Sequence, residues 1–496
     1  MRTQRNKGFK RVLYSNFISV GSVVCIFYAK VSSEDATVAE KKAMIIDINR
    51  ISALLLNNEQ PSNAIVEIIL DKALKLKGLT LEDVAILLNV RAPLREAILK
   101  TAGEVKQAVF GRRIVLFAPL YLSNECVNNC LYCGFRIENR EAARKTLSVE
   151  EAVREAKTLE AKGYKRLLLV AAENPSKSNI DYILKVIEAI YRETDIRILH
   201  LNAAPMPVDD LERLKVAGIG VLQVFQETYH PETYAMMHPS GRKKDYSYRL
   251  SAMDRAIDAG FDDLGIGALL GLYDWRFEVL ATIAHARYLK ERYGIWPHTI
   301  SVPRLRPATG SAIKETPYPV SDEEFKLIVA IYRLAVPTAG VVVSTREGAD
   351  LRREVLAVGA SQISAGSKTE PGGYEEDEEH YEAAQFATDD HRTLDEVIED
   401  VATLGYMPSL CTSCYRAGRT GSGFHDMASS GAIKDYCSAN AVLTLKEYVL
   451  DSASDSKEAC EEAIERELDL LTDETFRTGV KEKLLKIEAG ERDIYY

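Results

Sequence analysis

The chain has 496 residues, of which 46% are hydrophobic and 27% charged, and its net charge is −10. This composition is typical of a soluble globular protein, and the acidic balance argues against a nucleic-acid partner, which needs a basic surface. No apolar stretch reaches the roughly 18 residues of a membrane-spanning helix, so no membrane segment is expected.

Residues 1–40 differ in composition from the rest of the chain. They contain no acidic residue before Glu34, several serines and six basic residues, namely Arg2, Arg5, Lys7, Lys10, Arg11 and Lys30. This composition is typical of an organelle transit peptide, and the alternative is a frayed or spurious extension. We therefore treat residues 1–40 as a targeting or disordered extension.

Residues 41–110 show the three- and four-residue spacing of apolar side chains that predicts helices. Eight runs rich in apolar and β-branched residues follow, alternating with helix-like segments, at 114–122, 166–172, 196–204, 219–226, 264–272, 298–305, 340–347 and 361–367. The alternation predicts an α/β fold, a TIM-type (β/α)8 barrel over residues 111–369, with an open doubly wound sheet as the alternative. In a barrel, functional groups are expected on the loops that follow the strands.

The composition changes again after residue 369. Residues 370–396 are strongly acidic, and we expect them to form a solvated loop. The remainder is polar and helical in pattern, with no further strand series. Residues 370–496 are therefore predicted to form a C-terminal, mainly helical domain.

Three cysteines, Cys126, Cys130 and Cys133, follow the first predicted strand with the spacing C-x₃-C-x₂-C. Three thiolates on one loop can hold three irons of a 4Fe–4S cluster and leave the fourth iron open. A zinc knuckle usually has four protein ligands, and buried structural cysteines do not explain an open triad after a barrel strand. The motif resembles that of radical SAM enzymes, in which S-adenosylmethionine (SAM) occupies the open iron and yields a 5′-deoxyadenosyl radical.

This resemblance implies further SAM-binding residues. Glu173 lies where the family has a Gly-Gly-Glu-like motif, although alanines replace the glycines here. Gly265 and Gly267 match a glycine stretch that packs against adenine, and close helix–strand packing is the alternative. Arg249 is a candidate for the SAM carboxylate, with a surface position on a helix as the alternative.

A second set of cysteines, Cys411, Cys414 and Cys437, has the spacing C-x₂-C-x₂₂-C. It again offers three thiolates with one iron position free. A zinc site completed by His425 competes with this interpretation, and a redox dithiol is weaker because no thioredoxin-like βαβ unit surrounds the pair. Clustered cysteines of this kind indicate metal sites in a reducing compartment. We expect a cytoplasmic protein, or one of the matrix or stroma of an anaerobic organelle if residues 1–40 are a transit peptide, and not a secreted one.

Over residues 45–480 the chain resembles the HydG family of radical SAM tyrosine lyases, the maturases of FeFe-hydrogenase. The matching segments are YLSNECVNNCLYCGF (121–135), QVFQETYHPETY (223–234), DDLGIGALLGLYDWRFEVL (262–280), PHTIS (297–301), SQISAGS (361–367) and CTSCYRAGRTG (411–421). The resemblance implies cleavage of the Cα–Cβ bond of L-tyrosine to p-cresol and dehydroglycine, which becomes CO and cyanide on iron for the hydrogenase H-cluster. A ThiH-like 2-iminoacetate synthase of thiamine thiazole synthesis, a relative without the C-terminal cysteines, is one alternative, and an iron–sulfur scaffold or carrier protein is another.

The same resemblance implies roles for three further residues. His298, in PHTIS, would bind an extra iron, and Arg346 and Ser364 would hold the tyrosine carboxylate, a task that suits the planar fork of arginine. The implied cofactors are two 4Fe–4S clusters, SAM, the extra iron and a free L-cysteine. The implied partners are L-tyrosine, an electron donor such as ferredoxin or flavodoxin, and other hydrogenase maturation proteins.

Overall fold

The computed structural model describes residues 45–56, 60–375 and 382–496. Residues 45–496 make up one compact unit. The predicted targeting extension, residues 1–40, lies outside the described residues. Among the helices that are described, none has the length and apolar character needed to cross a membrane.

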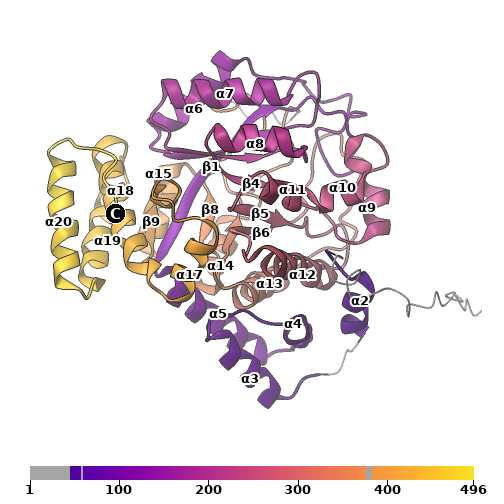
Figure 1. The fold of residues 1–496 in the computed structure, drawn as a ribbon, viewed down its shortest axis with the longest axis horizontal. Helices are drawn as coiled ribbons and strands as arrows, with labels where there is room; N and C mark the ends of the chain where they lie inside the picture. Colours follow the sequence, from indigo (N-terminus) through magenta and orange to yellow (C-terminus); the bar gives the residue numbers. More distant parts are fainter. Residues whose placement is uncertain (1–44, 57–59, 376–381) are drawn as a thin grey trace, which may run out of the picture. The chain divides into compact units, whose positions relative to one another are not determined.

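Eight parallel strands close into a barrel at the centre of this unit (Figure 1), because β1 pairs with both β2 and β8. The strands are β1 (Arg113–Ser123), β2 (Arg166–Ala171), β3 (Ile198–Asn202), β4 (Ile219–Gln223), β5 (Leu264–Gly267), β6 (Thr299–Ser301), β7 (Gly340–Val343) and β8 (Gln362–Ser364). Each begins within two residues of its predicted run. The predicted (β/α)8 barrel is confirmed, and the open sheet is excluded.

Helices cover the outside of the barrel, since each strand is followed by an amphipathic segment that buries its apolar side against the sheet. They are α6 (Val149–Ala161), α7 (Ile180–Glu193), α8 (Val208–Val216), α9 (Pro231–Met237), η1 (Arg242–Lys244), α10 (Tyr246–Leu250), α11 (Ala252–Asp258), α12 (Trp275–Tyr293), α13 (Asp322–Ala335) and α14 (Ala349–Val358). Ser148 and Ser321 begin α6 and α13 with capping boxes, in which the serine side chain and a glutamate three residues later satisfy each other's backbone N–H groups.

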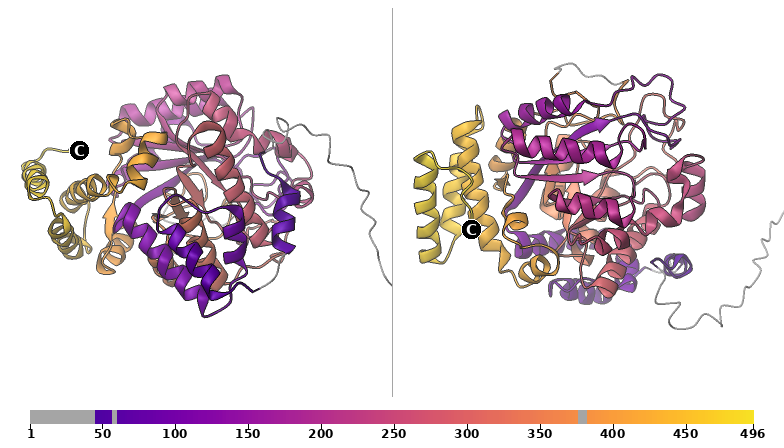
Figure 2. Two further views of the ribbon diagram at one scale, coloured as in Figure 1. Left: turned by 60° about the horizontal axis from the view of Figure 1, so that its bottom comes forward. Right: turned by 45° about the horizontal axis from the view of Figure 1, so that its top comes forward.

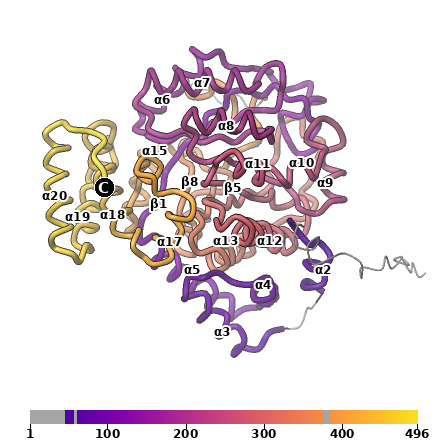
Figure 3. Tube along the Cα trace, in the orientation of Figure 1, coloured from indigo at the N-terminus to yellow at the C-terminus, as the bar shows by residue number. Residues whose placement is uncertain are grey.

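The predicted N-terminal helices are present as α2 (Ile48–Leu56), α3 (Asn63–Ala73), α4 (Leu81–Leu88) and α5 (Leu94–Phe110). The last of these packs on α13 and α14 of the barrel, as the tube in Figure 3 allows the reader to follow. These helices therefore extend the outer helical layer.

The C-terminal region packs beside the barrel, with its last helices at one side (Figure 2). It contains α15 (Leu394–Thr403), β9 (Met407–Ser409), α16 (Ser413–Arg416), α17 (Gly421–Ser429), α18 (Ile433–Asp451), α19 (Lys457–Leu470) and α20 (Glu474–Glu488). The short strand β9 was not predicted, and it pairs in parallel with the first residues of β1. It thereby fixes the following Cys411 near the amino ends of the barrel strands.

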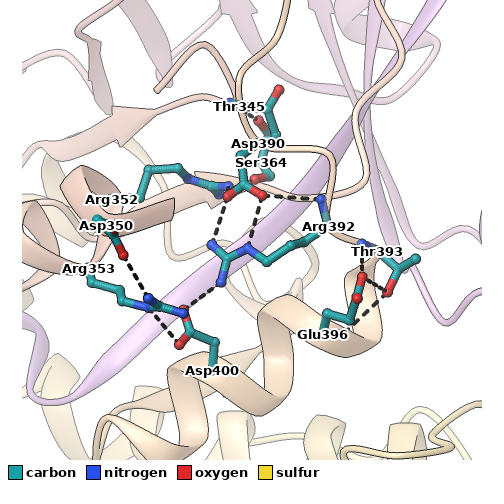
Figure 4. A network of polar contacts seen from close by, with 10 residues as sticks. All are labelled: Thr345, Asp350, Arg352, Arg353, Ser364, Asp390, Arg392, Thr393, Glu396 and Asp400. Carbon is teal, nitrogen blue, oxygen red and sulfur yellow. Dashed lines mark hydrogen bonds and ion pairs between the residues drawn. The ribbon is translucent and has the colours of Figure 1, made fainter. Parts of the chain in front are cut away.

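The prediction of a solvated loop over residues 370–396 is wrong for the parts that the structure describes. Ala383, Ala384 and Asp390 are buried, and residues 382–390 form what we call the roof segment over the carboxyl ends of the strands. Asp390 forms buried ion pairs with Arg352 and Arg392 (Figure 4). Acidic composition was misleading because part of this charge is neutralised inside the fold.

Candidate active site

The first cysteine set lies on the loop after β1, at the carboxyl end of the barrel. Backbone hydrogen bonds hold this loop to three other parts of the chain: Val127 N donates to Glu173 O at 2.9 Å, Leu131 N to Met237 O at 3.0 Å, and Gly134 N to Gln385 O at 3.1 Å. Cys130 is buried, and Cys126 and Cys133 are partly exposed. The three thiols are therefore placed by the surrounding loops and not by the spacing alone.

Asn128 links this loop to predicted site residues. Its side-chain nitrogen donates to the carboxylate of Glu173 at 2.7 Å, and its side-chain oxygen accepts the backbone N–H of Lys243 at 2.8 Å. Its backbone N–H also points at the sulfur of Cys126, at 3.4 Å. Glu173 thus lies beside the cysteine loop, where sequence matching placed it.

The electrostatics of the first set fit a cationic cluster. Burial, together with the nearby charges of Cys130 and Cys126, raises the pKa of Cys133 to about 12. Burial likewise raises the pKa of Cys130. Thiolates that repel one another in this way need the positive charge of bound iron to be stable, which is the requirement of a thiolate-ligated cluster. No group of three or more His, Cys, Asp or Glu side chains in the described residues is arranged around a single metal ion.

A cavity of about 180 Å³ lies inside the barrel, next to Cys133. Its apolar part is formed by side chains of three strands, Phe117, Leu168 and Val342, which pack together. Polar side chains line the rest, among them Asn202, Ser301, Ser344 and Ser364. An apolar surface with a few convergent polar groups is typical of a site for a small ligand, and here it suits an aromatic amino acid.

Arg346 is placed in this cavity as a cation without a protein counter-ion. Its Nη1 donates to Arg304 O at 3.4 Å, and no carboxylate of the described residues pairs with it. The ring of Phe386, from the roof segment, lies under the guanidinium with 3.2 Å between Cζ and the ring centroid. Burial lowers the pKa of Arg346 to about 10, so the group remains charged near neutral pH. An enclosed, unpaired guanidinium favours a carboxylate ligand.

Ser364, at the end of β8, also lines the cavity, and its hydroxyl accepts the backbone N–H of Thr345 at 3.2 Å. Arg352 donates to Ser364 O and pairs with Asp390 of the roof segment (Figure 4). Asp389 N and Asp390 N both donate to Thr345 O, at 2.9 and 3.1 Å. The roof segment therefore holds the strand ends that carry Ser364 and Thr345.

Sequence reasoning missed Glu227, which follows β4 and lines the same cavity. Its φ of 71° is the left-handed conformation that a residue other than glycine rarely adopts. Lys243 pairs with its carboxylate at 2.6 Å and Arg249 at 3.4 Å. The backbone of Glu227 is strained, which is common at functional sites. Its carboxylate, between two cations, is a candidate hydrogen-bond acceptor for a bound ligand. Its position after a barrel strand, in the segment QVFQETY, was the signal that could have identified it.

Arg249 is buried, which excludes the surface position considered for it. Its Nε donates to Phe225 O at 2.6 Å, next to the Glu227 loop. It also lines a second, more open pocket that contains Glu173. The structure thus brings Glu173, Arg249 and the first cysteine loop together.

Gly265 and Gly267, on β5, allow close packing inside the barrel. A Cβ atom at Gly265 would lie 2.5 Å from Gln223 Cγ, and one at Gly267 would lie 2.7 Å from Ser301 O. Neither glycine lines the cavity described above. Close packing therefore accounts for both glycines within this structure.

The second cysteine set lies at the opposite, amino end of the barrel. Arg166, the first residue of β2, donates from Nη2 to Cys411 O at 2.6 Å. Cys414 belongs to α16 and Cys437 to α18, so three separate elements supply this set. A hydrogen bond from Cys437, followed by the charges of Arg113 and Arg419, lowers the pKa of Cys414. These thiols converge in cationic surroundings, which fit an iron–sulfur cluster.

His298 faces this second set, as its family position implied. Its Nδ1 lies 3.1 Å from Oδ1 of the fully buried Asp263, and its Nε2 accepts the hydroxyl of Tyr415 at 3.0 Å. A carboxylate behind a histidine is the usual arrangement of a metal-binding imidazole. His425 instead uses Nδ1 with Thr338 Oγ1 and Nε2 with Trp296 O, both at 2.8 Å, so neither nitrogen is directed at the cysteines.

Comparisons with known proteins agree with this geometry. Residues 120–284 match the radical SAM superfamily model, and residues 301–407 match the biotin and thiamin synthesis associated domain. The 2-iminoacetate synthase of Salmonella typhimurium is 35% identical over 341 residues, which cover 68% of this chain and 88% of that protein. Cysteines 411, 414 and 437 lie beyond the second of these matched domains.

Solved structures extend the similarity over more of the chain. A crystal structure of HydG, a maturase of FeFe-hydrogenase, is 46% identical with a TM-score of 0.88, and the match covers 91% of this chain and 100% of that one. HydG from Carboxydothermus hydrogenoformans is 41% identical with a TM-score of 0.77, covering 88% and 97% of the two chains. The chain belongs to the radical SAM family that includes the HydG proteins and the 2-iminoacetate synthases.

Proposed function

We propose that this chain is a radical SAM lyase that cleaves the Cα–Cβ bond of L-tyrosine and converts the dehydroglycine fragment to CO and cyanide for the FeFe-hydrogenase H-cluster. The observation that carries the proposal is the placement of two cysteine sets at opposite ends of one barrel. Cys133 lines the cavity at one end. At the other end the backbone oxygen of Cys411 accepts a hydrogen bond from Arg166, the first residue of β2. A fragment made at one end would then pass to the other through the barrel.

Tyrosine would bind with its carboxylate on Arg346 and its ring against the apolar side chains of the cavity. Arg346 has no carboxylate partner in the described part of the chain, so a substrate carboxylate would complete its ion pair. Ser364 lies in the same cavity and is held by Thr345. The roof segment covers this end through Gln385 and Phe386, which limits the entry of water to a hydrolysable imine.

SAM would be held beside the first cysteine set by Glu173, Glu227 and Arg249. Glu173 is bonded to the loop of Cys126 through Asn128, and Glu227 lines the cavity that Cys133 enters. Gly265 and Gly267 would contribute by leaving room in the barrel wall rather than by direct contact. This arrangement supports a SAM site beside the proposed tyrosine cavity.

Cys411, Cys414 and Cys437 would hold the second 4Fe–4S cluster, and His298 would bind an extra iron together with a free L-cysteine. When bound, the first cluster and SAM supply the radical that attacks tyrosine, and the second cluster supplies the iron on which CO and cyanide form. Arg113 and Arg419 are the cations that balance the thiolates of the second set. Asp263 orients His298.

The experiment is anaerobic incubation of the reconstituted chain with SAM, a reductant and tyrosine. We expect p-cresol, 5′-deoxyadenosine and metal-bound CO and cyanide, the last two detected by infrared spectroscopy. A Cys411→Ala, Cys414→Ala double variant should still release p-cresol but form no CO. Cys460→Ala is the matched control, because Cys460 is buried in α19 and bonded to Ser456, away from both sets.

The outcomes separate the alternatives. CO from the double variant would contradict the role of the second set. p-Cresol without CO from the unaltered chain would favour a 2-iminoacetate synthase, and no p-cresol at all would leave only an iron–sulfur scaffold or carrier.

The proposed partners follow from this reaction. The first cluster needs a one-electron donor such as ferredoxin or flavodoxin, and the iron product needs other hydrogenase maturation proteins to receive it. Oxygen-sensitive clusters place the reaction in the cytoplasm or in the matrix or stroma of an anaerobic organelle. Sequencing the mature N-terminus would test the second location, because loss of residues 1–40 is expected there.

A further inference from the structure

Tyr415 occupies the floor of the barrel, between the tyrosine cavity and the second cysteine set. It follows Cys414 on α16, and its ring lies against groups from different strands. The ring centroid is 5.1 Å from that of His200 on β3 and 5.7 Å from that of His298, and the guanidinium carbon of Arg166 lies 5.5 Å away. A Cβ atom at Gly220 of β4 would come within 3.0 Å of the same ring. This side chain therefore lies among residues of β2, β3 and β4 and beside His298 at the amino end of the barrel.

The hydroxyl of Tyr415, the residue that follows Cys414, is hydrogen-bonded to Nε2 of His298. Nδ1 of His298 lies 3.1 Å from the Asp263 carboxylate, and although the two atoms are not aligned as a hydrogen bond, this negative charge favours a proton on Nδ1. Nε2 then carries the lone pair and accepts the Tyr415 hydroxyl at 3.0 Å. A cation can bind this lone pair only if the hydroxyl leaves it.

His200 offers the displaced hydroxyl a second partner. Its Nδ1 accepts the backbone N–H of Val221 at 3.0 Å, so the neutral ring carries its proton on Nε2. That Nε2–H has no hydrogen-bond partner in the residues that the structure describes, although the side chain is only 5% exposed. This buried donor without an acceptor, on a ring tilted by 59° to that of Tyr415, is positioned for the hydroxyl in a second rotamer.

We propose that Tyr415 is a two-position residue: its hydroxyl holds Nε2 of His298 until a divalent cation binds there, and it then turns to accept the Nε2–H of His200. The inference rests on the proposed function in one respect, namely that His298 binds a cation. When the cation binds, the Tyr415 side chain turns from His298, next to β6, toward His200 on β3. Cation binding at the second site thereby changes the passage between that site and the tyrosine cavity.

The test is titration of the anaerobically reconstituted full chain with Co²⁺, followed by its ligand-field absorption. Tyr415→Phe keeps the ring and removes the competing hydrogen bond, so Co²⁺ should bind about fivefold more tightly, which corresponds to about 1 kcal/mol. His298→Ala should weaken the binding at least tenfold. Tyr406→Phe is the control, because Tyr406 lies beside Lys106, away from the floor, and should match the unaltered chain.

A double-mutant cycle tests the second position. His200→Phe removes the donor and keeps an aromatic ring, and it should weaken Co²⁺ binding severalfold in the unaltered chain but not in the Tyr415→Phe background. The loss of the acceptor for Val221 N occurs in both backgrounds, so the cycle cancels it. Equal weakening in both backgrounds would exclude the move to His200.

Three results would overturn the proposal. Unchanged or weaker Co²⁺ binding in Tyr415→Phe would show that the hydroxyl does not compete, and unchanged binding in His298→Ala would show that the cation binds elsewhere. Equal effects of His200→Phe in the two backgrounds are the third. The titration does not depend on turnover, and p-cresol from the same preparations reports separately on the lyase reaction.

Discussion

The two cysteine sets are built differently, although each offers three thiols. The first lies on a single loop, where backbone N–H groups of Asn128 and Phe135 point at the sulfurs of Cys126 and Cys133 at 3.4 Å. The second is assembled from a turn, from α16 and from α18, which only the tertiary structure brings together. The spacing predicted both sets, but the second also needs the fold to bring Cys437 to Cys411 and Cys414.

Their electrostatics differ as well. In the first set, burial and mutual repulsion raise the pKa of Cys133, so the free thiols are favoured until a metal binds. In the second set, a hydrogen bond from Cys437 and then the charges of Arg113 and Arg419 lower the pKa of Cys414, while the same hydrogen bond and burial raise the pKa of Cys437, so one thiolate of this pair is favoured before a metal binds. These surroundings fit the proposed open cluster next to a substrate at the first end of the barrel and the proposed second cluster, held among cations, at the other.

The largest expected effect is at the carboxyl end. Arg346→Met should lower kcat/KM for p-cresol formation roughly 10²–10³-fold, because the substrate carboxylate would be left in the cavity without its cation. Assays of p-cresol at several tyrosine concentrations measure this. Arg353→Met, on the exposed side of α14, is the matched control and should stay within about twofold. An equal loss in both variants would remove Arg346 from the substrate site.

A smaller effect, on stability, is expected at the ion pairs that hold the roof segment. Burial alone would raise the pKa of Asp390, but the hydrogen bond from Arg392 and the charge of Arg352 outweigh it and lower the pKa to about 2. Asp390→Asn leaves a buried arginine without its counter-ion, so stability should fall by about 2–3 kcal/mol. Thermal unfolding measures this fall.

Asp350→Asn provides the contrast, because Asp350 is 93% exposed and pairs with Arg353 at the surface (Figure 4). Exposed pairs contribute little, so its unfolding midpoint should match that of the unaltered chain. If the two variants behaved alike, the roof segment would not depend on its buried ion pair.

The fold was largely predictable because parallel barrel strands are apolar on both sides and alternate with amphipathic helices. All of these strands except β1 nevertheless end earlier than their predicted runs. The run predicted at 219–226 ends as a strand at Gln223, and Phe225 and Glu227 turn into the cavity. In the sequence these residues look like a continuation of the strand. In the structure they line the cavity, which becomes apparent only once the barrel is closed.

The site was predictable where covalent spacing determines the geometry, as for Cys126, Cys130 and Cys133. It was not predictable where the geometry comes from contacts between distant segments. Gln385 accepts the hydroxyl of Tyr121 at 2.9 Å across 264 residues of sequence, and it lies in a segment whose acidity suggested a solvated loop. Composition reports average exposure and cannot show which acidic residues are paired inside.

The remaining expected effect is a pH dependence at the carboxyl end, which is spread over several pH units. Burial raises the pKa of Glu278 on α12 to about 8, while its carboxyl group accepts hydrogen bonds from Thr228 and from Tyr229 N, next to the strained Glu227. Glu278 is therefore protonated in the folded chain at pH 7 and ionised in the unfolded chain. The unfolded state binds fewer protons between about pH 5 and pH 8, so stability should fall as the pH rises through this window, by at most about 1.4 kcal/mol per pH unit.

Glu278→Gln has no proton to lose, and the stability difference between it and the unaltered chain, measured by denaturant unfolding at each pH, should shift in favour of the variant from pH 5 to pH 8. A difference that stayed constant with pH would mean that Glu278 is already ionised in the folded chain, and the loop that carries Glu227 would then be held by a charge rather than by a neutral carboxyl group.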